Sequence, residues 1–212
     1  MALEVEARFR ADGQATLDRL AARPTLGAAQ LGEPRAVEEV DRYLDTHDGR
    51  LRTALWACRL RSREGATRIS LKGPPDAPAS GWLHRRPEVE GPATDVIDPR
   101  RWPPSAARDL LDELARGAPL VEWLRLVQRR TERAVVVAGR HVGTLTLDAV
   151  AAERDRRALG NLHVVELEIR AETGVEADLA PLAEVLAAED GLAPEPRTKL
   201  ELALDFAEPP AA

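Results

Sequence analysis

The chain has 212 residues, of which 44% are hydrophobic and 31% are charged, a composition typical of a folded globular protein rather than a disordered one. Its formal net charge of −6 argues against a nonspecific nucleic-acid binder, and its single cysteine, Cys58, excludes an intrachain disulfide. Neither an apolar run of membrane-spanning length nor a signal-peptide pattern occurs. We therefore expect one domain over residues 1–212, cytoplasmic, a monomer or homodimer, with no membrane or nucleic-acid partner.

The first strand is predicted over residues 3–9, where LEVEARF alternates apolar and charged side chains. Glu4, Glu6 and Arg8 share one face of this strand. A strand with one face in water also shows such a pattern, so this segment alone leaves a solvated face and a functional face both open.

The N-terminal half continues with short elements separated by turn residues. In chain order they are a helix over 14–22, a strand over 37–45, a helical turn over 50–54, strands over 55–63 and 67–73, a loop over 73–81, and a strand over 84–90. Pro87 lacks a backbone donor, which predicts that the last of these strands lies at a sheet edge or contains a bulge.

The C-terminal half is predicted to mix long strands with helices. In chain order its elements are a loop over 91–104, a helix over 105–116 with Ser105 as its cap, strands over 119–137 and 142–148, a polar loop over 151–160, a strand over 163–170, and helices over 175–190 and 197–206. We expect these elements to form a single domain, because no linker separates them.

Charged side chains occupy alternate positions of several predicted strands. The acidic ones are Glu4, Glu6, Glu88, Glu90, Asp148, Glu166 and Glu168. The basic ones are Arg59, Arg61, Lys72 and the run over 129–133, to which Lys199 at the start of the last helix is added. Such a sheet either leaves its charged face in water or closes into a barrel with that face inside.

Inside a barrel, these two groups of charges predict a particular ligand. Paired carboxylates are oxygen-only ligands and favour Mg²⁺ or Mn²⁺. Clustered Arg and Lys side chains bind a polyanion such as a phosphate chain. Both groups together indicate a metal-bound polyphosphate.

The arginine run leaves its register open. Alternation places either Gln128 and Arg130, or Arg129, Thr131 and Arg133, on the charged face. Arg130 is the preferred candidate, and Arg133 is retained as a second one.

Taken in order, these strands resemble the CYTH superfamily, the triphosphate tunnel metalloenzymes, from about residue 2 to residue 205. The resemblance is carried by EVEAR, RYLDT followed by CRLRSR, ISLKG, RRPEVEGP, VQRRTER, LTLDA, VVELEIR and RTKLELAL. It implies an α+β fold in which a closed eight-stranded antiparallel β-barrel surrounds a tunnel, with peripheral helices. Arg8 departs from the family pattern, which usually has Lys there; Arg keeps the charge but cannot accept a proton near neutral pH.

The resemblance also implies roles for individual residues. Metal binding falls to Glu4, Glu6, Glu88, Glu90, Asp148, Glu166 and Glu168. Substrate binding falls to Arg59, Arg61, Lys72, Arg130, Arg133 and Lys199. Direct participation in catalysis falls to Glu4, Glu6, Arg8 and Lys72.

The expected activity is metal-dependent hydrolysis of a triphosphate, with Mg²⁺ or Mn²⁺ as cofactor. Inorganic triphosphate is the first choice of substrate, because the tunnel strands show no aromatic side chain that would stack on a base. The alternatives are a class IV-type adenylyl cyclase or a thiamine triphosphatase of the same fold, and a polyphosphate-binding module without turnover. The last alternative draws its support from Arg8.

Overall fold

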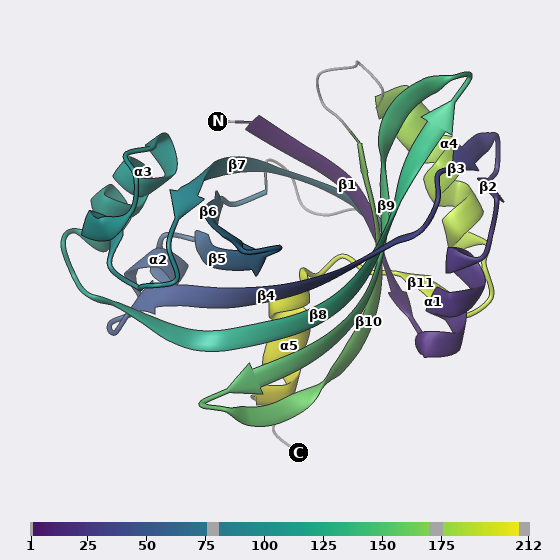
Figure 1. The fold of residues 1–212 in the computed structure, drawn as a ribbon. Helices are drawn as coiled ribbons and strands as arrows, with labels where there is room; N and C mark the ends of the chain where they lie inside the picture. The colour runs from purple at the N-terminus through teal and green to yellow at the C-terminus, as the bar shows by residue number, and fades with distance from the viewer. Residues whose placement is uncertain (1, 76–80, 170–175, 208–212) are drawn as a thin grey trace.

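A computed structural model describes residues 2–75, 81–169 and 176–207, and its centre is a closed β-barrel (Figure 1). The barrel strands are β1 (Ala2–Ala11), β4 (Arg35–Thr46), β5 (Ala57–Arg63), β6 (Ala66–Lys72), β7 (Leu83–Ala93), β8 (Leu120–Val137), β9 (Arg140–Arg154) and β10 (Arg157–Ile169). They pair antiparallel in the order β8-β4-β5-β6-β7-β1-β10-β9, and β9 pairs with β8 to close the ring. The predicted eight-stranded barrel is confirmed.

Smaller elements surround the barrel. They are α1 (Gln14–Ala21), β2 (Thr25–Leu26), β3 (Ala29–Leu31), α2 (Arg50–Thr53), a 3-10 helix (Pro99–Arg101), α3 (Ala106–Ala115), α4 (Glu176–Ala187), β11 (Leu192–Pro194) and α5 (Lys199–Ala207). As predicted, the Ser105 hydroxyl caps α3 by accepting a hydrogen bond from the backbone N–H of Arg108. Within the described residues, no helix is long and apolar enough to cross a membrane.

Most of the apolar core lies outside the barrel, because the strands direct their charged faces inward. Val5, Ala7 and Phe9 of β1 belong to a buried cluster that includes α1 and α4. Cys58 and Leu60 of β5 belong to a second cluster with α2 and α3. Figure 1 shows these two helix pairs on opposite sides of the barrel. Burying the outer faces under helices leaves the lumen free to hold polar groups.

One end of the lumen is apolar and is covered by α5. Leu126 of β8, Val150 of β9 and Val164 of β10 lie an even number of residues from the inward-facing charged positions of the same strands. They pack with Leu202 and Ala203 of α5. Lys199, the first residue of that helix, consequently lies where the apolar end meets the charged part of the lumen.

Two predictions about local structure are wrong. Residues 151–160 are not a loop, because β9 and β10 continue to Arg154 and from Arg157 around a tight turn at Asp155 and Arg156. Both turn residues have positive φ, 51° and 63°, as a two-residue hairpin turn requires. The polar composition of residues 151–160 is typical of a loop, but here it reflects the exposure of the ends of β9 and β10 to water.

Pro87 does not mark an edge or a bulge. Strand β7 pairs with β1 on one side and with β6 on the other, in regular register. Pro87 lies one residue beyond the last β6–β7 pair, Lys72 with Glu88, and its carbonyl accepts a hydrogen bond from Gly73. Pro87 has no N–H to return the second bond of that pair, so the β6–β7 ladder ends at Lys72 and Glu88.

Candidate functional site

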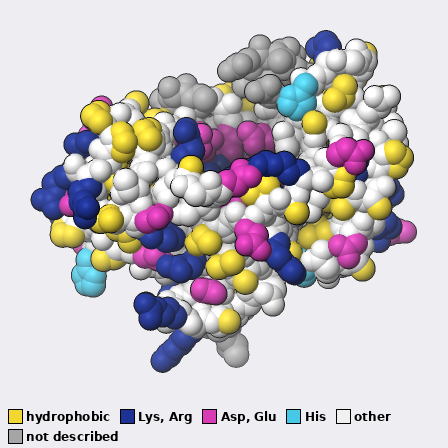
Figure 2. Space-filling view, viewed as in Figure 1, with side chains coloured by type: hydrophobic (Ala, Val, Ile, Leu, Met, Phe, Trp, Pro, Cys, Tyr) yellow, Lys and Arg dark blue, Asp and Glu magenta, His cyan; other side chains and the backbone are white. Residues whose placement is uncertain are grey.

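The barrel encloses a cavity of about 310 Å³ whose wall is dominated by charged side chains. The acidic ones are Glu4, Glu6, Glu88, Glu90, Glu132, Glu166 and Glu168, and the basic ones are Arg8, Arg59, Arg61, Arg63, Lys72, Arg86, Arg130 and Lys199. Figure 2 shows acidic and basic side chains gathered in a hollow on one face of the molecule. The structure thus brings together all of the predicted site residues except Asp148 and Arg133.

Two carboxylates face each other across the seam between β1 and β10. Glu6 is the register partner of Glu168, and like charges placed directly opposite destabilise a sheet. Burial, reinforced by Glu4 and Glu166, raises the pKa of Glu6 despite the nearby Arg8 guanidinium. Glu168 remains accessible to water, yet desolvation by the barrel wall and the charges of Glu4 and Glu6 raise its pKa to about 7. Glu168 makes no hydrogen bond or ion pair with any other described residue.

Arg8 ties this seam to the chain segment before α5. Its guanidinium donates to Glu166 at 2.9 Å, to Glu6, and to the backbone carbonyl of Arg197 at 2.9 Å. The side chain is only 1% exposed, and the acidic neighbours Glu6 and Glu166 outweigh its desolvation and raise its pKa. Arg8 is therefore a fixed cation that holds two carboxylates in place.

The neighbouring wall of the cavity, formed by β5, β6 and β7, presents cations. Lys72 pairs with Glu4 and lies 3.4 Å from Glu88, and Arg86 donates to Glu4 at 2.8 Å. These two cations outweigh the desolvation of Glu4 and lower its pKa. Arg59 differs from them, since it makes no hydrogen bond within the described chain and its nearest carboxylates, Asp41 and Glu88, are 3.6 Å and 3.8 Å away.

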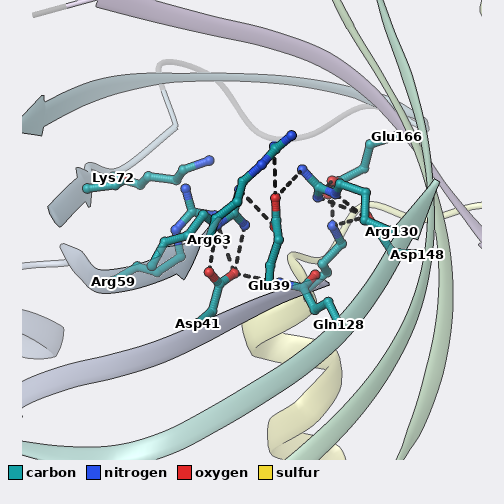
Figure 3. A network of polar contacts seen from close by, with 12 residues as sticks. Glu39, Asp41, Arg59, Arg63, Lys72, Gln128, Arg130, Asp148 and Glu166 are labelled. Carbon is teal, nitrogen blue, oxygen red and sulfur yellow. Dashed lines mark hydrogen bonds and ion pairs between the residues drawn. The ribbon is translucent and has the colours of Figure 1, made fainter. Parts of the chain in front are cut away.

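A network below these cations holds the arginines of β5 (Figure 3). Arg61 donates two hydrogen bonds to Asp41 at 2.6 and 2.7 Å, and Gln128 adds a third at 2.8 Å. Burial opposes ionisation of Asp41, but Arg61 and Arg59 outweigh it and hold the pKa of that carboxyl below its usual range. Arg63 donates to Glu132 at 2.6 and 2.7 Å.

The similarity to known proteins agrees with this geometry. The model of the CYTH domain matches residues 2–201. The chain belongs to the CYTH domain family. No curated protein matches the sequence.

Solved structures with this CYTH fold share little sequence with the chain. A putative adenylyl cyclase from Hippeastrum, described as having a dominant triphosphatase activity, is 16% identical over 95% of both chains with a TM-score of 0.57. A putative adenylate cyclase from Bacillus halodurans is 19% identical over 95% of this chain and 98% of that chain, with a TM-score of 0.56. The PH1819 protein of Pyrococcus horikoshii is 18% identical over 94% and 98%, with a TM-score of 0.53. At these identities the likeness establishes the fold alone.

Arg133 was predicted to bind substrate, but in this CYTH domain it lies away from the cavity. It lies on the opposite face of β8 from Arg130 and does not border the cavity. Its guanidinium donates to the backbone carbonyls of Gly32, Ala21, Arg23 and Leu31. The residue fastens the segment around β2 and β3 to the barrel, so the structure gives it no place in substrate binding.

Asp148 also lies behind the cavity wall instead of bordering it. Arg130 donates to it at 2.7 and 2.9 Å (Figure 3), and Lys199 donates to it at 2.5 Å. Its oxygens are therefore engaged by two cations that themselves line the cavity. Asp148 is better described as a support for Arg130 and Lys199 than as a metal ligand.

Sequence reasoning missed three charged residues that line the cavity, Arg63, Arg86 and Glu132, and two acids behind its wall, Glu39 and Asp41, that pair with Arg61. On β4 both faces carry charges, with Glu38 and Arg42 outside and Glu39 and Asp41 inside, so alternation could not choose between them. Arg63 and Arg86 could have been found by alternation, because Arg63 shares a predicted face with Arg59 and Arg61, and Arg86 shares one with Glu88 and Glu90.

The carboxylates of this CYTH domain suit a divalent cation. Within the described ranges, no group of three or more Asp, Glu, His or Cys side chains is already arranged around a metal position. The donors near the seam are nevertheless all oxygens. Burial and, after it, the neighbouring carboxylates raise the pKa values of Glu6 and Glu168, and a bound cation would offset both effects. This donor set fits Mg²⁺ or Mn²⁺.

Proposed function

We propose that this CYTH domain hydrolyses the terminal phosphoanhydride bond of a triphosphate substrate with the help of a bound divalent cation. The observation that carries the proposal is the presence of two unsatisfied side chains in one cavity: among the described residues, the Arg59 guanidinium has no hydrogen-bond partner and the Glu168 carboxylate has no ion-pair partner. A metal-bound triphosphate supplies an anion for the first and a cation for the second.

The remaining charges favour an exchange of partners upon binding. Lys72 and Arg86 now neutralise Glu4, and phosphate oxygens would replace that carboxylate on both cations. On Glu4, a divalent cation would take the place of Lys72 and Arg86, and it would also neutralise Glu6 and Glu168. Each buried charge keeps a partner throughout, which avoids the penalty of leaving one unpaired.

The chemistry follows from this arrangement. Glu4, Glu6 and Glu168 would hold the cation, which when bound neutralises charge on phosphate oxygens and lowers the pKa of water. Arg59, Lys72 and Arg86 orient the phosphate chain and stabilise negative charge on it. Water adds to the terminal phosphorus, and the bond to the bridging oxygen breaks with its electron pair on the leaving diphosphate. The proton of the water passes to solvent.

In this proposal Arg8 supports the reaction by holding carboxylates in place, without contacting the substrate. It holds Glu6 and Glu166, and each of its three guanidinium nitrogens already donates to a protein acceptor. The Hippeastrum relative gives an example of the same fold with a described triphosphatase activity.

The test is phosphate release from inorganic triphosphate, ATP and thiamine triphosphate, with Mg²⁺, with Mn²⁺ and with chelator. We expect metal-dependent release that is lost in Glu4→Gln. Glu113→Gln, a change at an exposed position of α3, serves as the matched control. Tight binding of triphosphate without release would favour the binding-module alternative. A cyclic nucleotide and diphosphate as products would establish cyclisation instead of hydrolysis.

A further inference from the structure

A second cavity, of about 430 Å³, adjoins the barrel cavity and is called the side pocket here. The two cavities share part of their lining, namely Tyr43, Ala57, Lys72, Arg86, Thr198 and Leu200. Lys72 and Arg86 are two of the cations proposed to hold the phosphate chain. A group attached to the end of that chain would therefore enter the side pocket.

The side pocket has a different chemical character from the barrel cavity. Trp56 and Trp123, two of the four tryptophans of the chain, line it together with Leu55 and Pro74. Its volume lies within the range of roughly 300–1,000 Å³ that is usual for small-molecule sites. Aromatic and apolar walls with a few polar groups at one end suit a planar organic group.

Leu55 is held in this wall against its backbone preference. It ends α2 with φ of 61°, and the N–H of Trp56 bonds back to the carbonyl of Leu51, a helix ending that usually has Gly at this position. The leucine side chain is 69% exposed, so burial in the core does not explain its presence. Such strained positions cluster at ligand sites.

The two tryptophans are fixed by close contacts. Gly73 directly follows Lys72, and a Cβ at this glycine would come within 3.0 Å of the Trp56 ring and 2.8 Å of Pro87. The indole thus lies on the backbone beside Lys72. The Arg52 guanidinium stacks 4.5 Å from the centre of the Trp123 ring and is itself held by Asp45 at 2.8 Å.

We propose that the side pocket binds the neutral planar base of a nucleoside triphosphate whose phosphate chain occupies the barrel cavity. This inference rests on the proposed function. Basic side chains outnumber acidic ones around the pocket, with Arg52, Lys72, Arg85 and Arg86 against Glu201, which disfavours a cationic group. The Trp56 indole provides the stacking surface that the inward-facing strand positions lack, while Trp123, whose ring carries the Arg52 guanidinium, completes the wall.

The inference revises the preference for inorganic triphosphate. That preference rested on the absence of aromatic residues from the charged strand faces. Trp56 precedes β5, and Trp123 lies at a register shift of β8 against β4, between the residues paired with Tyr43 and Leu44, where regular alternation is interrupted. Neither was visible to an analysis of those faces.

The experiment compares ATP, inorganic triphosphate and thiamine triphosphate with the full chain and Mg²⁺, measuring KM and, by calorimetry, Kd. We expect ATP to bind at least tenfold more tightly than inorganic triphosphate. Leu55→Gly suits the backbone at this position, so it should fold, weaken ATP about fivefold or more, and leave inorganic triphosphate unchanged. Trp56→Leu should act in the same direction.

Ala138→Gly is the matched control, since it relieves a positive φ of 49° in an exposed turn outside both cavities. This variant should change the KM and Kd of neither ATP nor inorganic triphosphate. Equal affinity for ATP and inorganic triphosphate, or tighter binding of thiamine triphosphate, would overturn the inference while leaving triphosphate hydrolysis intact. If no substrate is hydrolysed, the proposed function fails, and the calorimetric comparison still decides the role of the side pocket.

Discussion

The ammonium group of Lys199 lies 2.5 Å from a carboxylate oxygen of Asp148, and this pair fastens α5 to the barrel. Asp148 is completely buried, and Arg130 shares the same carboxylate. Burial opposes its ionisation, but Lys199 and Arg130 together lower its pKa. Two buried cations thus share the Asp148 carboxylate, and Lys199 also donates to Glu166 at 2.6 Å.

Asp148→Asn should therefore destabilise the protein strongly. Removing one partner of a buried ion pair costs about 3–5 kcal/mol, since the other charge remains buried. Asp155→Asn, in the exposed hairpin turn, should cost little, because Asn tolerates its positive φ. Urea denaturation of both variants measures the difference. A loss below about 1 kcal/mol for Asp148→Asn would show that the two cations find other partners.

Glu168 predicts a pH dependence of the metal-free protein. Its folded-state pKa of about 7 exceeds its ordinary value of 4.5, so the folded state binds a proton that the unfolded chain has already released. The contribution of Glu168 to stability should fall as pH rises from about 4.5 to about 7 and be constant outside that window. Thermal unfolding of wild type and Glu168→Gln across this range isolates the contribution as the difference. Added Mg²⁺ should stabilise wild type more at pH 8 than at pH 5.5; an equal effect at both would separate Glu168 from the cation site.

Arg59 and Arg61 should separate binding from stability. The Arg59 side chain makes no hydrogen bond to any described residue, so the unfolding free energy of Arg59→Met should stay within about 1 kcal/mol of wild type. Triphosphate binding should weaken by roughly tenfold to a hundredfold, as expected for a lost charged hydrogen bond of about 1.5–3 kcal/mol. Arg61→Met should instead destabilise the fold by about 3 kcal/mol, since Asp41 loses two hydrogen bonds. Chemical denaturation and substrate titration of both variants provide the measurement. The prediction would be contradicted if Arg59→Met lost stability while Arg61→Met lost mainly substrate affinity.

Arg133 should matter for folding alone. Arg133→Met leaves four carbonyls without their donor and should cost about 3 kcal/mol or more. Turnover per folded molecule should be unchanged at a temperature where the variant is folded. Arg129→Met, exposed on the same face of β8, is the control and should alter neither quantity. A specific rise in KM for Arg133→Met would restore it to the substrate site.

Arg8→Lys tests the departure from the family pattern. An ammonium cannot reach Glu6, Glu166 and the Arg197 carbonyl in the separate directions that the guanidinium serves. We expect lower stability, by about 1–3 kcal/mol, and turnover at or below the wild-type rate. Rates measured across about pH 6–10 provide the check. A gain of tenfold or more, about 1.4 kcal/mol in barrier, would assign a proton-transfer role to the lysine.

The alternation of apolar and charged residues correctly predicted which side chains share a face, in those strands whose two faces differ clearly in polarity. Glu4 and Glu6 alternate with Val5 and Ala7, and the structure places the acids inside the barrel and the apolar residues in the core. The closed barrel itself followed from the resemblance of the ordered motifs rather than from any one strand. Such patterns specify register because a one-residue slip would bury charges in the core.

The remaining features depend on pairing between distant segments. In the arginine run, only the register of Arg130 with Asp148 decides which guanidinium points inward. The role of Arg133 required knowledge that β3 pairs with β8. The position of the side pocket depends on where α2 ends, which no periodicity in the strands encodes.

The seam between β1 and β10 has a consequence for synthesis. Arg8 and its partner Glu166 are separated by 158 positions, so β1 leaves the ribosome long before the strand that covers its second edge. At about 5–20 residues per second the delay is roughly 8–30 s. During that time Glu4, Glu6 and Arg8 lie along an unpaired strand edge, and charges at such edges discourage association with other chains. The residues proposed to act on substrate in the mature barrel would thus also protect the nascent chain from aggregation.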